Sequence, residues 1–587
     1  MSPPAARLLF EDATLAHVCD HCPTVHPQVA ERSKAFRRRV FEFRPGTFAG
    51  IEYLGSSVMV VGPEGAVVVG AVSHLTDGAL VAKHFSALRG DKPIRAVVYN
   101  DSLADNYGGV EAFVADEDAK AGKVAIIAHE SFERVMLDNL GDVSDIAAWR
   151  GAYQAGAFLP KGPEGLVHTG AIAYSRGPVS YVAPNVLIKD SWQGTPGGVR
   201  TEIYHFPAES DDGIVTWFPE QKTLVVGHVL FGDLLPQVYA QRGIVRSPKR
   251  WYKGIESLID FVQRHDVEYM VPMHWFEPIV GSERIMEVLT INRDTLQFIA
   301  DQSARYINKG WRPDDLATLG LPPHLANHPE LQEHYGRLQQ HLRQQYVDSL
   351  GWFEGDPTFL DPMPELDRAR HYVAAMGGRD AVLSKAQTAL RNGERLWAAE
   401  LLTLLIRVDR SDRQALALKA STLRELGYAA PNATYRNWFL TSALELEGKL
   451  PDVRMDKSAF MPAKILGALS PVDVLETLKS RLMAERVFDL DYRITLRFDD
   501  RNDAVSVQIR RGVLVVDARA PANADGELRL SSATLHALAD NRETLSAAID
   551  TGKVVVVRGD RSVLQRIEGS FEPASHGTVN VAAPVNR

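Results

Sequence analysis

The sequence predicts a layered α/β domain, followed by an all-α domain and a small α+β domain. Short β-rich runs alternate with helical patterns between residues 50 and 281. Strand signals are missing between residues 282 and 450, and alternating strands return between 451 and 587. Alternation of strands and helices is typical of layered α/β folds, and separate runs of each indicate separate domains. We therefore predict a leader over 1–49 and domains over 50–281, 282–450 and 451–587.

Length and charge agree with this division and exclude some functions. A chain of 587 residues is too long for one hydrophobic core. Its formal net charge of −9 provides no basic surface for a phosphate backbone, so no nucleic-acid partner is expected. No window holds the roughly 18 apolar residues of a membrane span, and the first residues lack a signal-peptide pattern. The expected location is the cytoplasm.

The leader contains five soft or borderline metal ligands within ten residues: His17, Cys19, His21, Cys22 and His26. The two cysteines are the only ones in the chain, and their spacing excludes a disulfide framework. A Cys-x-x-Cys pair with a nearby histidine, here Cys19, His21 and Cys22, is a possible second metal site. A redox dithiol and a reduced pair in a packed leader remain open as alternatives. Residues 27–41 are basic and predicted to be helical.

Between residues 50 and 281, hydrophobic spacing predicts individual elements. Helices are expected over 75–88 and 248–264. Strands are expected over 56–61, 66–69, 96–99, 124–128, 201–206, 214–218, 223–227 and 268–271. Hairpins among these strands make the predicted sheets mixed.

The remaining residues divide into a helical part and a strand-rich part. Helices are expected over 288–307, 331–346, 381–390, 394–408, 412–426 and 435–446. Stacked helix pairs of this kind usually form packing or association surfaces, so we expect a homodimer through this part. The last part is predicted to contain strands over 492–498, 504–510, 513–516, 527–530 and 553–558, with helices over 472–484 and 532–551. Such a sheet can bury one face.

A polar loop follows the predicted strand over 96–99. The sequence from 96 to 110 reads Ala-Val-Val-Tyr-Asn-Asp-Ser-Leu-Ala-Asp-Asn-Tyr-Gly-Gly-Val. Asn100, Asp101, Asp105 and Asn106 therefore crowd polar groups between a buried strand and a turn at Gly108-Gly109. A loop of this kind in an α/β chain normally holds a metal site.

Several stretches together carry a family resemblance: residues 96–110, 121–129, Met273-His274-Trp275, 351–357 and 372–378. In this order they resemble the metallo-β-lactamase-fold alkylsulfatases. The resemblance implies a metallo-β-lactamase-like αββα sandwich, a helical dimerisation domain and a C-terminal domain similar to sterol carrier protein 2. A fold does not carry function with it, so the site must be compared residue by residue.

The polar loop departs from the family's pattern. The family's loop supplies three histidines and one aspartate to two metal ions. At these positions this chain has Asp101, Leu103, Asp105 and Asn106, so only the aspartate is retained. Leu103 cannot coordinate a metal, and a neutral Asn106 is a weak ligand compared with imidazole.

The later positions retain more of the pattern. Glu209 aligns with the family's first acidic ligand, and His228 stands where a metal-bridging carboxylate is expected. His274 matches the closing histidine. Arg242 matches a region in which an arginine meets sulfate, and guanidinium geometry suits this oxyanion.

The resemblance thus implies a candidate ligand set of Asp101, Asp105, Glu209, His228 and His274. Asp105, His228 and Arg242 are the expected catalytic residues. A carboxylate-rich set favours iron or manganese over the imidazole-rich zinc sites of this fold, although a weakened zinc site stays open. One or two divalent ions are expected, and a standard dizinc alkylsulfatase is not.

Two functions of different classes follow. The first is a metal-dependent enzyme that hydrolyses an amphiphilic sulfate or related ester, or that performs iron-dependent redox chemistry on a small metabolite. The second is a metal-free binding or scaffolding protein that has lost hydrolase activity. Its polar loop would then be a turn scaffold, because Asp and Asn commonly bond to turn backbone.

Overall fold

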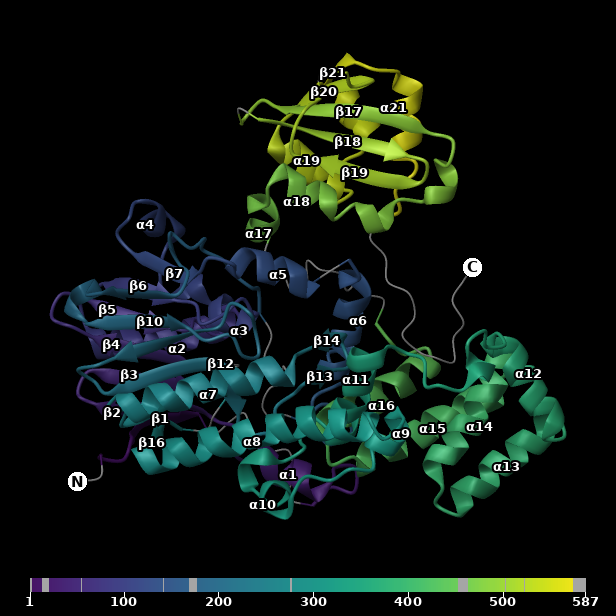
Figure 1. Ribbon diagram of the computed structural model, residues 1–587, viewed down its shortest axis with the longest axis horizontal. Helices are drawn as coiled ribbons and strands as arrows, with labels where there is room; N and C mark the ends of the chain where they lie inside the picture. The colour runs from purple at the N-terminus through teal and green to yellow at the C-terminus, as the bar shows by residue number, and fades with distance from the viewer. Residues whose placement is uncertain are drawn as a thin grey trace. The chain divides into compact units, whose positions relative to one another are not determined.

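The computed structural model describes residues 3–12, 21–53, 55–140, 142–167, 177–274, 277–451, 463–501, 503–521 and 523–573. One compact unit holds the α/β and helical parts (Figure 1). A second unit holds the C-terminal strands and helices together with residues 140–149. Within the described ranges, no helix combines the length and hydropathy needed to cross a bilayer.

An eight-stranded sheet forms the first layer of the α/β part. Its strands lie in sequence order: β1 Arg7–Asp12, β2 Arg38–Arg44, β3 Thr47–Ile51, β4 Ser57–Val61, β5 Ala66–Val69, β6 Ile94–Val98, β7 Ala125–His129 and β8 Val186–Ile188. Pairing is antiparallel from β1 to β5 and parallel from β5 to β8. Helices α2 Leu75–Arg89, α3 Ala104–Tyr107, α4 Asp116–Lys120, α5 Phe132–Leu140 and α6 Ser144–Ala155 lie between these strands in the sequence.

A six-stranded sheet forms the second layer, in the order β16-β15-β12-β11-β10-β9. Its strands are β9 Ser191–Gly194, β10 Thr201–His205, β11 Ile214–Phe218, β12 Thr223–Gly232, β15 Tyr269–His274 and β16 Ile279–Val280. One apolar core joins residues from both sheets, including Val67, Val98 and Val225. All ten residues of β12 are buried, as expected for a central strand covered on both faces.

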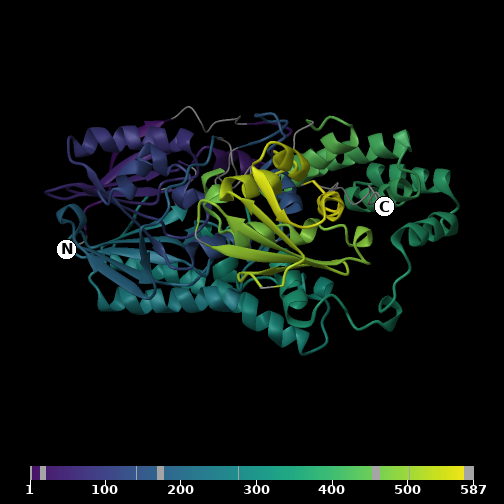
Figure 2. The same ribbon diagram turned by 90° about the horizontal axis from the view of Figure 1, so that it is seen from above.

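Two long helices cover the other face of the second sheet. They are α7 Pro248–Arg264 and α8 Ser282–Ile307, which share a second core with β12. Figure 2 shows these teal helices along one side of the strands. The two layers and their helices give the predicted αββα sandwich. Helix α7 begins and ends at the predicted residues.

The leader is the main correction to the predicted elements. The basic stretch 27–41 is only partly helical, because α1 covers Pro27–Ser33 and β2 begins at Arg38. Strands β1, β2 and β3 all join the first sheet, so the predicted boundary at residue 49 falls inside β3. Ion pairs across β1 and β2, such as Arg39 with Glu11, accommodate charged side chains on these strands.

The helical part follows α8 and contains mostly paired helices. They are α9 Pro313–Leu316, α10 Pro323–Ala326, α11 Leu338–Leu350, α12 Glu365–Ala375, α13 Arg379–Arg391, α14 Arg395–Val408, α15 Arg413–Ala429 and α16 Ala433–Leu446. Leu383, Leu402 and Leu405 lie in a core of their own between α13 and α14. The predicted helix over 331–346 starts later, at Leu338.

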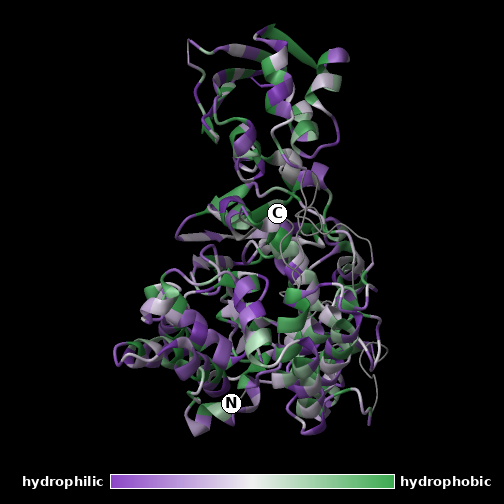
Figure 3. Ribbon diagram, turned by 90° about the vertical axis from the view of Figure 1, so that its right-hand side faces the viewer, coloured by the Kyte–Doolittle hydropathy of each residue, from purple (hydrophilic) through white to green (hydrophobic). Residues whose placement is uncertain are grey.

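The second unit is a five-stranded mixed sheet with helices, in the order β19-β18-β17-β20-β21. Its strands are β17 Asp491–Phe498, β18 Ala504–Arg510, β19 Val513–Asp517, β20 Gly526–Leu530 and β21 Val554–Arg558, and its helices are α17 Ala463–Ala468, α18 Pro471–Glu476, α19 Ser532–Ala539, α20 Leu545–Asp550 and α21 Arg561–Glu568. Figure 3 shows hydrophobic and hydrophilic residues alternating along these elements. The predicted helix over 532–551 is two helices, because Asn541 adopts a positive φ of 53° between them.

Candidate metal centre

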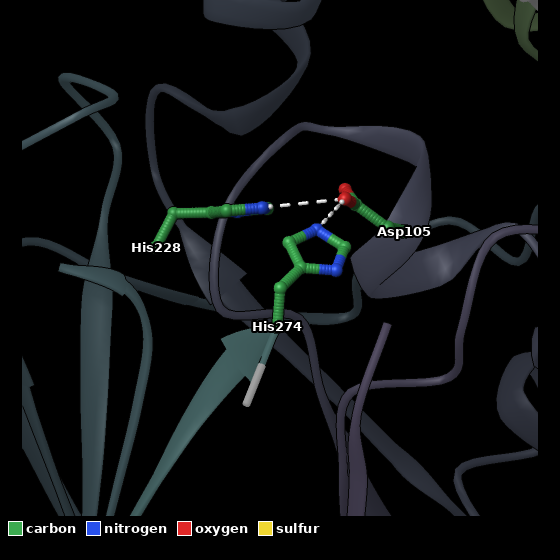
Figure 4. Close-up of side chains that lie close together, drawn as sticks. All are labelled: Asp105, His228 and His274. Carbon is green, nitrogen blue, oxygen red and sulfur yellow. Dashed lines mark hydrogen bonds and ion pairs between the residues drawn. The ribbon is translucent and has the colours of Figure 1, made fainter. Parts of the chain in front are cut away.

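Three predicted ligands converge at one end of the α/β layers. The Nε2 atom of His274 lies 2.9 Å from Oδ2 of Asp105, and Nε2 of His228 lies 3.2 Å from the same oxygen (Figure 4). One ligand atom from each residue lies within 4.8 Å of the other two. We call Asp105, His228 and His274 the open trio, since the Asp105 side chain keeps 19% of its surface exposed.

Separate elements position the three side chains. Asp105 lies on α3, directly after the loop that follows β6, whereas His274 is the last residue of β15. His228 lies within β12, which pairs in parallel with β15 and shifts its register at Gly227. Gly227 has a φ of 51°, and a Cβ there would come within 2.6 Å of Asn100 Cβ. The glycine therefore lets β12 approach the polar loop and directs His228 at it.

The electrostatics of the open trio favour opposite charges. Burial disfavours a charged imidazole, but the Asp101 and Asp105 carboxylates outweigh it and raise the pKa of His228 well above its usual value. Burial likewise disfavours an ionised Asp105, but His228 and His274 outweigh it and hold the pKa of this carboxyl well below its usual value. Asp105 is therefore an anion that faces two imidazoles, and a bound cation could take their place as its positive partner.

Asp101 and Asn106 lie behind the open trio and bond to it. Asp101 Oδ2 lies 2.8 Å from His228 Nδ1, and its Oδ1 accepts from Asn106 Nδ2 at 2.7 Å and from the Leu103 N–H at 2.9 Å. Asn100 in turn donates to Asn106 Oδ1 at 3.1 Å. Asp101, predicted as a ligand, thus has both oxygens engaged by protein donors.

Glu209, the fourth predicted carboxylate ligand, lies beside the trio but pairs with an arginine. Arg246 Nη2 lies 2.5 Å from Glu209 Oε1, and both side chains are almost fully buried. Arg246 also donates to Gln237 O at 2.9 Å. The sequence interpretation missed Arg246. The signal available was a second arginine four residues after Arg242, in Arg242-Gly-Ile-Val-Arg246.

Arg242 lies next to this ion pair and adds a second guanidinium. Its backbone N–H donates to Gln154 Oε1 at 3.3 Å. Burial lowers the pKa of Arg246, and the positive charge of Arg242 contributes to the same effect. A guanidinium suits an oxyanion carrying two or more oxygens. Arg246 is already engaged by Glu209 and Gln237, so Arg242 is the candidate for such a ligand.

Asp212 is a further buried carboxyl near Asp101. It is fully buried and accepts from the Ser210 and Ser102 hydroxyls. Burial and the Asp101 charge raise the pKa of Asp212 to about 7. We call Glu209, Arg246 and Asp212 the closed group, because none of them is open to solvent. Glu209 and Ser210 line one small pocket together with Asp101 and His228.

The predicted second metal site lies partly outside the described residues. His17 and Cys19 fall in the undescribed stretch 13–20. Cys22 packs against an apolar cluster with Val25, Val29 and Val167, and His21 is exposed. His26 caps α1 by accepting from the Gln28 N–H. Cys22 is disulfide-bonded, so the structure shows neither the reduced pair nor a free thiolate ligand at this residue. A redox role for this segment stays a prediction.

The residues present fit one divalent ion. The open trio offers one carboxylate and two imidazole Nε2 atoms, a donor set that zinc and non-haem iron both accept with open positions remaining. A second ion has no comparable set, since Leu103 is apolar, Asp101 is fully hydrogen-bonded and Glu209 is paired with Arg246. Among the residues with described placement, no other group of three ligands lies so close together.

Three family matches cover the chain in the order of its parts. Residues 50–274 match the metallo-beta-lactamase superfamily. Residues 313–449 match a family described as alkyl sulfatase dimerisation, and residues 459–577 match one described as alkyl sulfatase C-terminal. The predicted fold class is confirmed in all three parts.

Individual relatives agree with these matches. A linear primary-alkylsulfatase of a Pseudomonas species is 37% identical over 470 residues, which cover 78% of this chain and 87% of that protein. An (R)-specific secondary-alkylsulfatase of Pseudomonas is 29% identical and covers 94% of this chain and 84% of its own length. The solved structure of the stereoselective inverting sec-alkylsulfatase Pisa1 from Pseudomonas superposes with a TM-score of 0.86 at 26% identity, over 96% of this chain and 92% of that one. This chain therefore belongs to the alkylsulfatase family of the metallo-β-lactamase fold.

Proposed function

We propose that this protein hydrolyses the sulfate ester of an aliphatic alcohol with a single divalent ion held by the open trio. The observation that carries the proposal is the convergence of Asp105, His228 and His274 on one point. The relatives that hydrolyse alkyl sulfates supply the substrate class.

Different residues of the chain would hold the ion, bind the sulfate group and exclude water. When bound, a divalent ion supplies Lewis acidity and makes a water molecule acidic enough to react near neutral pH. Arg242 would hold the sulfate oxygens through paired N–H donors, because a guanidinium matches such an oxyanion. Phe231 is buried beside the site and packs against His274 at 5.2 Å between ring centroids, so it excludes water from one side.

A redox reaction is the second candidate for the same centre. Two histidines and one carboxylate form the facial arrangement of non-haem iron oxygenases, and the open trio has this composition. The sulfatase relatives favour hydrolysis instead, and we give hydrolysis precedence for that reason.

Metal content and sulfate release test the proposal together. Protein purified without added metal and then loaded with Zn²⁺, Mn²⁺ or Fe²⁺ should retain about one equivalent per chain after dialysis. The loaded protein should release sulfate from a linear primary or a secondary alkyl sulfate. Oxygen consumption by the iron-loaded protein without sulfate release would replace hydrolysis with redox chemistry. Uptake below about a tenth of an equivalent of all three metals would support the metal-free alternative.

The ligand assignment needs a variant with a matched control. The double variant His228→Ala with His274→Ala should lose the ion and the activity. His129→Gln is the control, because His129 bonds to Ser131 Oγ and Lys189 O and stacks on His205, none of which belongs to the trio. Full metal content in the double variant would show that other residues hold the ion.

We also propose that two copies associate through the helical part. Large apolar side chains are exposed there, including Trp352 at 65%, Leu396 at 62% and Trp397 at 48%. The match of residues 313–449 to a dimerisation family supports this surface. Light scattering should give twice the chain mass for the parent protein, and Trp352→Glu with Leu396→Glu should shift it toward one chain. A monomeric parent protein would reject the proposal.

A further inference from the structure

His228 is held between two carboxylates, one at each ring nitrogen. Its Nδ1 lies 2.8 Å from Asp101 Oδ2, and its Nε2 lies 3.2 Å from Asp105 Oδ2. The side chain is 2% exposed, so no water competes for these contacts from a bulk surface. Each ring N–H thus has a carboxylate acceptor in the ion-free site. Asn106 Nδ2 also lies 3.3 Å from Nδ1, but an amide NH2 group cannot accept the Nδ1 proton, so Asp101 is its acceptor. An ion at Nε2 displaces only the Nε2 proton.

The two carboxylates differ in what else they do. Asp105 Oδ2 is shared by two imidazoles and lies at the exposed edge of the site. Asp101 is 1% exposed, and its second oxygen is taken by the Asn106 amide and the Leu103 N–H. Asp105 can exchange its imidazole contacts for an ion, whereas Asp101 would have to break two other hydrogen bonds first.

Hydrogen bonds fix the orientation of Asp101. The Asn106 amide that donates to Asp101 Oδ1 accepts from Asn100 at its own carbonyl oxygen. A reversed amide at Asn106 would lose both contacts, so the chain sets one orientation. Asp101 Oδ2 is thereby aimed at His228 Nδ1 before any ion arrives.

We infer that Asp101 is a positioning residue that holds His228 with its proton on Nδ1, so that Nε2 is the metal ligand. Metal-binding histidines usually donate their other N–H to a carboxylate or carbonyl, which fixes the ring and strengthens its binding. The pair also explains two departures from the family pattern together. Asp101 stands at a histidine position and His228 at a carboxylate position, and the structure shows them bonded to each other.

This inference rests on the proposed ion site but makes a separate claim about Asp101. If Asp101 were a ligand, its removal would change the number of atoms around the ion. If Asp101 positions His228, its removal weakens binding but leaves the ligand set of the saturated site unchanged. Co²⁺ distinguishes these cases, because the intensity of its visible absorption depends on coordination number and geometry.

The test compares Asp101→Asn with the parent and with Asp212→Asn. Asp212 is the matched control, since it is a buried carboxyl nearby whose hydrogen bonds go to Ser210 and Ser102. Zn²⁺ affinity, measured by competition with a chromophoric chelator, should fall by about 10–100-fold in Asp101→Asn. It should change by less than about threefold in Asp212→Asn, because that side chain does not orient a ligand. The Co²⁺ spectrum of Asp101→Asn at saturation should keep the parent's intensity.

A second variant protects the test against misfolding. Asp101→Ser retains a hydroxyl that can accept from the Leu103 N–H, and it should weaken Zn²⁺ binding in the same range as Asp101→Asn. Zn²⁺ affinity within threefold of the parent in both variants would overturn the inference while leaving the proposed function intact. A changed Co²⁺ intensity at saturation would overturn it by making Asp101 a ligand. A parent protein that binds no ion would overturn the proposed function and this inference together.

Discussion

Two groups of charged side chains lie around the polar loop of residues 100–106, and they balance their charges in different ways. In the open trio, Asp105 faces two imidazoles at the solvent edge, and the three residues can accept a cation. In the closed group, Arg246 already supplies the cation to Glu209, and Asp212 retains its proton up to a pH of about 7. In the open trio, a bound cation could take the place of the imidazoles as the positive partner of Asp105. In the closed group, Arg246 is already the positive partner of Glu209.

This difference is the reason why we propose one ion rather than two. A carboxylate that binds an ion must give up its existing partners, and a buried arginine is a costly partner to displace. Glu209 and Arg246 have side-chain exposures of only 1% and 5%. The polar loop of residues 100–106 contains no histidine, and the carboxylate of Glu209 beside it already has a positive partner in Arg246.

Removing the positive charge of Arg246 should give the largest effect on the stability of the protein. Arg246→Met leaves Glu209 buried without its charged partner, and breaking a buried ion pair costs about 3–5 kcal/mol. Urea unfolding followed by tryptophan fluorescence should show this as a clearly lower midpoint. The double variant Arg246→Met with Glu209→Gln should recover most of the loss, because it removes both charges. Equal stability of the parent and Arg246→Met would show that the ion pair does not neutralise this group.

The site residues that lie at or just after the ends of strands could be predicted from the sequence. Asp105 and His274 lie just after or at the end of parallel strands, so their meeting follows from topology. The role of Asp101 was not accessible, because the sequence shows a carboxylate but not which donors hold its oxygens. The partner of Glu209 lies 37 positions away along the chain and is found only once β12 and the loop after it are folded.

The same contrast holds for the secondary structure: elements with a regular local sequence pattern were predicted correctly, and elements that depend on distant partners were not. Helix α7 and strand β18 match their predicted bounds, since each depends on a regular local pattern. Strands β1 and β2 were missed, because Arg39 and Glu11 stabilise each other only across the sheet. A run of arginines is easily interpreted as the exposed face of a helix when the acidic residues that pair with them on a neighbouring strand are not known.

The pH dependence of stability should identify the protonated member of the closed group. Burial and the Asp101 charge raise the pKa of Asp212 to about 7, from 3.8 in the unfolded chain. The folded state therefore keeps a proton that the unfolded state releases, and stability falls as pH rises from about 4 to 7. Asp212→Asn should flatten this slope, which amounts to about 1.4 kcal/mol per pH unit for one such group.

Urea midpoints at several pH values measure this slope. Asp211→Asn is a suitable control, because Asp211 keeps 56% of its side chain exposed and pairs with Arg250. Identical slopes for the parent and Asp212→Asn between pH 4 and 7 would mean that the closed group holds three charges rather than two.

The smallest effect, on Zn²⁺ affinity, is expected at Asn106, which supports Asp101. Asn106→Ala removes the 2.7 Å hydrogen bond to Asp101 Oδ1 and the 3.3 Å contact with His228 Nδ1, but it leaves the Leu103 N–H contact in place. One such hydrogen bond contributes about 1 kcal/mol, so Zn²⁺ affinity should fall only about fivefold. Chelator competition would rank this variant between the parent and Asp101→Asn. A loss as large as that of Asp101→Asn would mean that Asn106 alone holds Asp101 in place and that the Leu103 N–H contact contributes little.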